Sequence, residues 1–145
     1  MISLKSFREY WEAMVDSVDG LKKSVALSVE SNMADKIAKI AKDDSPTLFF
    51  LAPSAEGSGS PDAFQEDNMC VIFIMQKYEP KHMSSEEVLE MVQPVMEAVK
   101  SRLLADCRCP CHFMRISDSK ISVLPETDLF GNWAGWSIGF TVISQ

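Results

Sequence analysis

Seven consecutive apolar residues, from Met69 to Met75 (MCVIFIM), form the longest apolar run in the chain. Side chains of a strand alternate between two faces, and here both faces are apolar, so the run predicts a buried β-strand over Asn68–Tyr78. We expect this strand to lie at the centre of a sheet that is covered on both sides. The run is much shorter than the roughly 20 residues that a membrane-spanning helix needs.

Shorter apolar segments predict the rest of the sheet. Thr47–Ala52 (TLFFLA) is bounded by two prolines, which is typical of a buried strand. Every second residue of Trp136–Val142 is large and apolar, which predicts a strand with one heavy face. Phe113–Ser117 and Lys120–Leu124 are candidate strands, joined by a tight turn at 118–119.

Two segments predict loops. Pro53–Asp67 (PSAEGSGSPDAFQED) combines glycine, serine and proline with four acidic residues, and we expect a long flexible loop at 53–67. It lacks the Gly-Lys-Ser/Thr signature of a phosphate-binding loop, and its acids would repel phosphate. Pro125–Asn132 is predicted to form a second loop.

The N-terminal part of the chain has helical periodicity. Ser3–Val18 has an apolar residue every three or four positions, which predicts an amphipathic helix with Ser3 as its N-cap. Residues 22–30 fit either a strand or a helix, and the β-branched valines favour the strand slightly. From Ser31 to about Lys42 the helical pattern is the clearer one, and the prolyl bond after Ser45 ends it.

A second helix is predicted in the middle of the chain. Ser84-Ser85-Glu86-Glu87 is a capping box, in which Ser84 is the N-cap. The helix should run from Ser85 to about Ala105, with a kink at Pro94. Met91 and Met96 fall on its apolar stripe, and we expect both in the core.

Together these elements predict a single α+β domain over residues 1–145. The expected sheet is mixed or antiparallel, with about four to five strands packed against two to three helices. The chain carries 14 Lys+Arg and 21 Asp+Glu, a net charge of −7, which argues against nucleic-acid binding because phosphate contacts need clustered cations. No secretory signal is recognised, so we expect the chain inside the cell, with its four cysteines reduced.

The segment Cys107-Arg108-Cys109-Pro110-Cys111-His112 concentrates thiols and an imidazole. Paired zinc-binding cysteines are usually separated by two or more residues, whereas these are separated by one. We interpret the segment as a helix-to-strand connection with small, partly buried cysteines. Metal binding and a thiol activated by Arg108 are the alternatives. No catalytic, cofactor-binding or metal-ligating residue is assigned.

Aromatic residues gather in Phe130-Gly-Asn-Trp-Ala-Gly-Trp136, immediately before the last predicted strand. Tryptophan is common both in cores and at interaction hot spots. We expect Trp136 on the core face of the strand. For Trp133 two positions fit equally well: an exposed or interface position, and a position in the core.

In this order the elements resemble the tail-terminator and minor tail proteins of long-tailed bacteriophages. The resemblance rests on the helix Ser3–Val18, the strand Met69–Tyr78, the helix Ser85–Ala105 with Gln-Pro-Val-Met at 93–96, and the aromatic ending at 132–144 (NWAGWSIGFTVIS). It implies a small α+β subunit of a ring, such as a hexamer, that stops growth of the tail tube and joins tail to head.

The resemblance implies a non-enzymatic structural protein that binds copies of itself and other tail or neck proteins. It implies no cofactor, nucleic acid or membrane, and a location in the host cytoplasm or the virion. One alternative is a small intracellular enzyme or a ligand- or metal-binding domain that uses Cys107–His112, with Pro53–Asp67 as a lid. Another is a bacterial adaptor that binds a partner protein through its aromatic loop.

Overall fold

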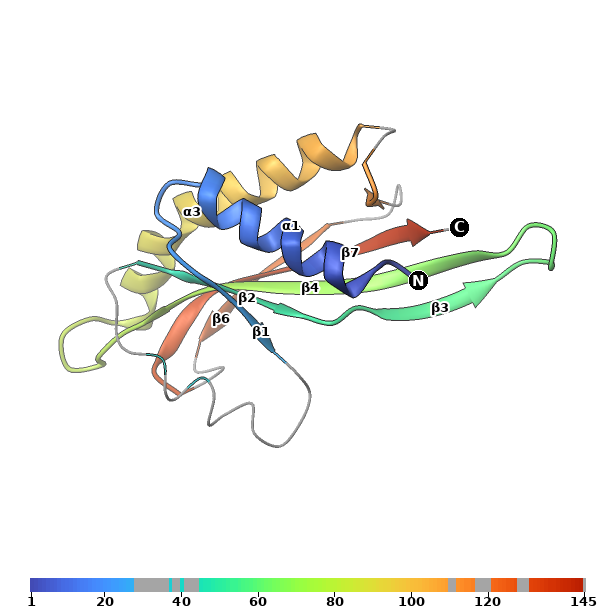
Figure 1. The fold of residues 1–145 in the computed structure, drawn as a ribbon. Helices are drawn as coiled ribbons and strands as arrows, with labels where there is room; N and C mark the ends of the chain where they lie inside the picture. Colours follow the sequence, from blue (N-terminus) through green and yellow to red (C-terminus); the bar gives the residue numbers. More distant parts are fainter. Residues whose placement is uncertain are drawn as a thin grey trace.

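The two longest strands, β4 (Gln65–Lys77) and β7 (Trp133–Ser144), run antiparallel to each other and form the centre of one sheet (Figure 1). Ile72 lies opposite Ile138 and Cys70 opposite Phe140, so the register places apolar side chains of both strands on one face. The computed structural model describes residues 1–27, 37, 40, 45–109, 112–116, 121–127 and 131–144.

Five shorter strands complete the sheet. β1 (Ser24–Leu27) pairs in parallel with β2 (Thr47–Leu51), which pairs antiparallel with β4, and β3 (Ser54–Ser58) continues along β4 beyond β2. β5 (Arg115–Ile116) and β6 (Ser122–Thr127) both pair antiparallel with β7. The described residues thus form a mixed seven-stranded sheet in an α+β domain, which has more strands than the four to five expected.

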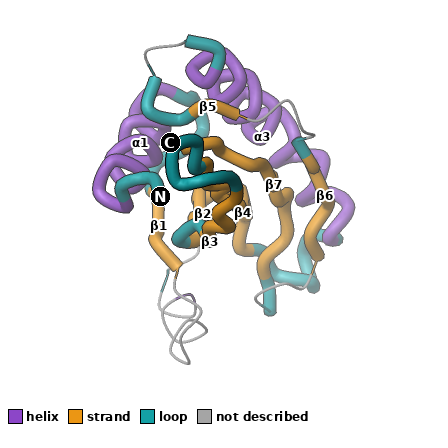
Figure 2. The backbone as a smooth tube through the Cα atoms, turned by 90° about the vertical axis from the view of Figure 1, so that its right-hand side faces the viewer, coloured by secondary structure: helices purple, strands orange, loops and turns teal. Residues whose placement is uncertain are grey.

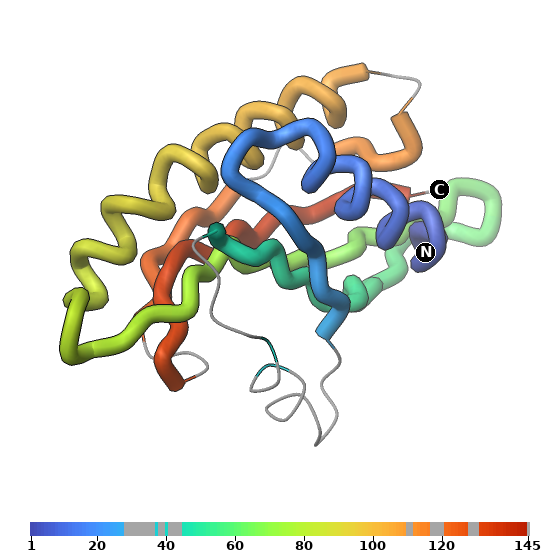
Figure 3. The backbone as a smooth tube through the Cα atoms, turned by 60° about the vertical axis from the view of Figure 1, so that its left-hand side comes forward, coloured from blue at the N-terminus to red at the C-terminus, as the bar shows by residue number. Residues whose placement is uncertain are grey.

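Both described α-helices, α1 (Leu4–Ser17) and α3 (Ser85–Cys107), lie on the same face of the sheet (Figures 2 and 3). The two predicted N-caps are confirmed, because the Ser3 hydroxyl accepts from the Ser6 amide at 3.3 Å and the Ser84 hydroxyl accepts from the Glu87 amide at 3.2 Å. Pro94 lies inside α3 and does not end it. None of the helices described is both long and apolar enough to cross a membrane.

The larger hydrophobic core lies between these helices and the sheet. Fully buried side chains from α1, α3 and the two central strands meet there, among them Phe7, Trp11, Ile72, Leu103 and Ile138. Trp136 packs against this core and donates from Nε1 to the Leu89 carbonyl at 3.0 Å, as expected for a core-facing residue. Met96 is buried as predicted, whereas Met91 is 44% exposed, so its predicted core position is wrong.

A smaller core lies on the opposite face. Phe49, Met75 and Trp133 are buried there with Leu27 and Ile37, and the rings of Phe49 and Trp133 meet edge to face at 5.2 Å between centroids. Only 3% of Trp133 is exposed, so the structure excludes the interface position that the sequence left open for it. This core covers one end of the face.

The structure resolves or corrects several predictions made from the sequence. The strand at 24–27 resolves the ambiguous segment as far as Leu27, while residues 28–30 and most of the helix predicted after Ser31 lie outside the described residues. The loop expected over 53–67 is wrong in extent, because β3 occupies Ser54–Ser58 and β4 begins at Gln65. Likewise β6 extends to Thr127, into the loop predicted at 125–132. The turn predicted at 118–119 lies outside the described residues.

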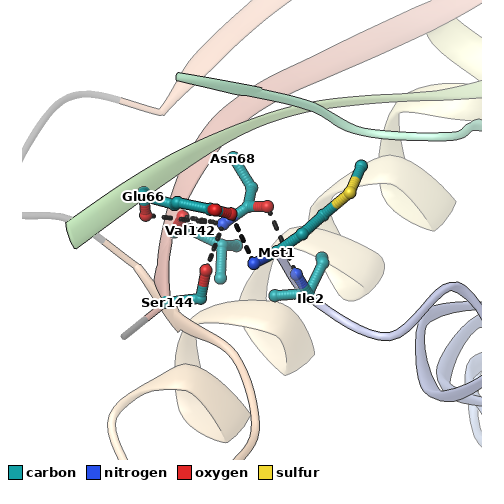
Figure 4. A network of polar contacts seen from close by, with 6 residues as sticks. All are labelled: Met1, Ile2, Glu66, Asn68, Val142 and Ser144. Carbon is teal, nitrogen blue, oxygen red and sulfur yellow. Dashed lines mark hydrogen bonds and ion pairs between the residues drawn. The ribbon is translucent and has the colours of Figure 1, made fainter. Parts of the chain in front are cut away.

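A buried asparagine joins the start of the chain to the sheet (Figure 4). The Asn68 side chain is fully buried; its Nδ2 donates to the Val142 carbonyl at 3.0 Å and to the Ser144 hydroxyl at 2.9 Å. Its Oδ1 accepts from the Ile2 amide at 3.3 Å, which positions the entry into α1. Next to it, the N-terminal ammonium of Met1 forms an ion pair with Glu66.

We expect Asn68→Ala to lower the free energy of unfolding by about 2–3 kcal/mol, because it leaves the Ile2 amide and the Val142 carbonyl without this partner. Denaturant unfolding followed by circular dichroism measures the loss. Ser144→Ala removes a single partner and should cost about 1 kcal/mol or less. An equal loss of unfolding free energy in the two variants would contradict the role assigned to Asn68.

Candidate interaction surface

The face of the sheet opposite the helices exposes apolar side chains, and we call it the open face. Because Cys70, Ile72 and Ile74 point into the large core, the alternate residues of β4 point the other way. Met69 is 48% exposed there, and Leu124 on β6 is 57% exposed. Val71 lies between them and is partly exposed. Phe73, level with Leu124, is partly buried against the small core around Trp133, and the partly exposed Ile143 lies beyond Met69.

Little of the described chain covers this strip. The small core around Trp133 covers the end of the face near β1, whereas Met69 and Ile143 lie toward the other end of the paired strands. Exposed apolar residues are common singly, but a continuous apolar strip on a sheet face is typical of a contact surface. The open face is therefore the first candidate interaction surface.

The second candidate is the two-stranded ribbon formed by β3 and the first residues of β4 (54–69), which we call the β3–β4 ribbon. It projects beyond both helices (Figures 1 and 3). All five residues of β3 are exposed. Near the tip, Phe64 lies over Gly57 and is still 51% exposed. Two-stranded ribbons are marginally stable alone in water, so this one is suited to pack against another surface.

The β3–β4 ribbon is strongly acidic. Glu56 and Asp67 lie directly opposite each other across the two strands, on the open face. Directly opposed side chains have Cβ atoms about 5 Å apart, and like charges there destabilise the pair. No lysine or arginine occurs between Lys42 and Lys77 to relieve this repulsion from within the ribbon.

The structure describes four residues of the segment at 107–112, which are Cys107, Arg108, Cys109 and His112. Cys107 ends α3, and burial raises the pKa of its thiol to about 11. Cys109 is disulfide-bonded, so the expectation of a reduced thiol is wrong for this residue. Cys111 lies outside the described residues. His112 accepts from the Met114 amide through Nδ1, and the described residues include no group of three or more potential metal ligands.

Thiol labelling tests this assignment. At neutral pH we expect iodoacetamide to modify Cys107 on the order of a hundred times more slowly than a free cysteine, and Cys70 on the order of a thousand times more slowly, since burial raises their thiol pKa values to about 11 and about 12. The Cys107 rate should rise with pH up to about 11, because only the thiolate reacts. Denatured protein is the control. Labelling of the native protein at the free-cysteine rate would contradict the assignment.

The structure also reveals a polar cluster between α1 and α3 that the sequence did not indicate. The Tyr10 hydroxyl donates to Asp106 Oδ2 at 2.9 Å, and the Arg102 side chain contacts the same oxygen at 3.2 Å. Burial and the neighbouring carboxylate raise the Tyr10 pKa, so the phenol remains a donor. The cluster lines a hollow of about 250 Å³ together with His112. Tyr10 and Arg102 both bond to Asp106, so we interpret the cluster as a structural link between α1 and α3.

Comparison with known proteins does not place the chain in a family. No protein-family model matches it, and no curated protein matches it either. What the chain does is therefore inferred from its two candidate surfaces, from its charge and from the order of its elements.

Proposed function

We propose that the chain is a non-enzymatic assembly subunit of a phage or prophage tail, of the tail-terminator kind, that forms a ring with copies of itself. The order of its helices and strands supports the proposal, because the resemblance to tail-terminator proteins rests on that order. The open face and the β3–β4 ribbon support the proposal, because both present surface that the described chain leaves uncovered. Other tail or neck proteins are the further partners.

One observation carries the proposal: half-exposed apolar side chains, Met69 and Leu124, lie on the sheet face opposite the two helices. Exposed apolar strips are typical of contact surfaces, and association with another copy would bury this one. The net charge of −7 supports a protein partner over nucleic acid. The protonated Cys107 thiol gives no support to the alternative of a thiol enzyme.

Size-exclusion chromatography with light scattering tests the proposal. We expect a mass that rises with concentration from that of one 16.2 kDa chain to a fixed multiple of it. A mass of one chain at every concentration, with no cross-linked species, would contradict self-assembly.

Two methionines of similar exposure allow a matched comparison. Met69 on the open face is 48% exposed and Met91 on α3 is 44% exposed. We expect Met69→Lys to weaken self-association at least about tenfold, because a lysine ammonium would have to lose water in the contact. Met91→Lys should leave association unchanged. The measurement is sedimentation of both variants beside the wild type, and equal behaviour of the two would count against the open face.

A further inference from the structure

We infer that neighbouring copies join head to tail, with the acidic β3–β4 ribbon of one copy against the β5 edge of the next, where Arg115 meets Glu56 and Asp67. This inference rests on the proposed function and names one contact between copies, at the edges of the sheet and separate from the apolar strip of the open face. It is carried by one row of residues that crosses the sheet, by the directions of the edge strands and by the exposed side chains at the two edges.

The row runs from one edge of the sheet to the other. Glu56 on β3 is opposite Asp67 on β4, Asp67 is opposite Ile143 on β7, and Ile143 is opposite Arg115 on β5. All four residues therefore lie at one level along the strands. The row has two acids toward the β3 edge and a base at the β5 edge. When a second copy lies alongside, the acids of one copy therefore face the base of the other.

Within one copy these charges stay apart. Neighbouring strands are about 4.8 Å apart, so β3 and β5 are separated by roughly 14 Å at this level. In the described part of the chain, neither Glu56 nor Arg115 has an ion pair, and Asp67 accepts a hydrogen bond from Gln65 at 3.2 Å. A neighbour's Arg115 beside the ribbon would relieve the repulsion between the two carboxylates.

Strand direction permits the same contact. Among the described strands, β3 pairs with β4 alone and β5 with β7 alone, so each has a free edge. Because β4 is antiparallel to both β3 and β7, and β5 is antiparallel to β7, β3 and β5 run in opposite directions. Two copies in the same orientation would thus bring these edges together as an antiparallel pair. Such a contact uses different surfaces on each copy and closes into a ring when its rotation permits.

Exposed aromatic residues accompany the charges at both edges. Phe64 is 51% exposed next to the start of β4, and Phe113 is 41% exposed two residues before β5. Phe64 packs over Gly57, and Phe113 meets the rings of Tyr10 and His112 at 6.0 and 4.9 Å between centroids, so only part of each ring is in water in the single chain. A contact between the ribbon and the β5 edge would place these exposed ring surfaces close to the interface and would add apolar area to the ion pairs.

Charge reversal tests the contact. We expect the double variant Glu56→Lys, Asp67→Lys and the single variant Arg115→Glu each to weaken self-association at least about tenfold, because each places like charges together. Mixing the two variants should restore it, since each then offers the other an edge of opposite charge. Lys81→Glu, on an exposed loop residue, is the control and should associate like the wild type. Circular dichroism checks that every variant folds.

The outcomes separate this inference from the proposed function. Reversed variants that associate as the wild type does would overturn the contact and leave an assembly protein that uses other surfaces. Loss of association in both variants without recovery on mixing would also overturn it, because the charges would then not be partners. A wild type that never associates would overturn the proposed function together with the contact.

Discussion

Gly135→Ala is expected to lower the free energy of unfolding by about 3 kcal/mol and the melting temperature by roughly 10 °C. A Cβ at this position would lie 2.0 Å from the Ile74 carbonyl oxygen and 2.8 Å from the Met75 Cα. Both atoms belong to the backbone of β4, so no side chain can rotate away. The two central strands would have to separate where they are buried.

Gly139, four residues further along the same strand, is the matched control. A Cβ there would have nothing closer than the Ser122 Cβ at 3.9 Å, an ordinary contact. We expect Gly139→Ala to leave stability unchanged or to raise it by up to about 1 kcal/mol, because alanine loses less backbone entropy than glycine on folding. Thermal unfolding of both variants makes the comparison, and an equal loss at the two positions would contradict the register of β4 and β7.

Trp11→Ala is expected to lower the free energy of unfolding by about 3–5 kcal/mol, the range for removing a large buried aromatic side chain. Trp11 is fully buried, and its ring meets those of Tyr10, Phe7 and Phe140 at centroid distances of 4.9, 5.7 and 6.2 Å. The loss would detach α1 from the sheet. Chemical denaturation measures it.

Trp11→Phe is the informative control. The indole Nε1 of Trp11 is buried and has no hydrogen-bond partner among the described residues. Phenylalanine keeps most of the ring contacts and removes this unpaired donor, so we expect a cost below about half that of Trp11→Ala. A cost as large as that of the alanine variant would contradict the packing described for α1.

The sequence predicted best those elements that local chemistry determines. Both helix N-caps, the buried strand at 47–51 and the core-facing Trp136 follow from capping residues and apolar periodicity within short windows. The extent of the 53–67 segment did not follow, because glycine and serine are poor strand formers and β3 exists through its pairing with β4. Tertiary pairing of that kind leaves little trace in a single sequence.

The candidate surfaces depended even more on tertiary structure. The apolar run at 69–75 predicted a strand covered on both sides, yet Met69 is half exposed, since only one end of the open face has a second core. Trp133 was a candidate for an interface and is instead part of that core. The row from Glu56 to Arg115 joins four strands far apart in sequence, so only their register reveals it.

Native mass spectrometry of the purified wild-type chain, at rising concentration and low salt, tests most directly whether this molecule works by assembly with its own copies. We predict a closed oligomer with one fixed number of 16.2 kDa chains, six in the tail-terminator case, which dissociates as ionic strength rises. A spectrum that contains only the single chain under all these conditions would contradict the account.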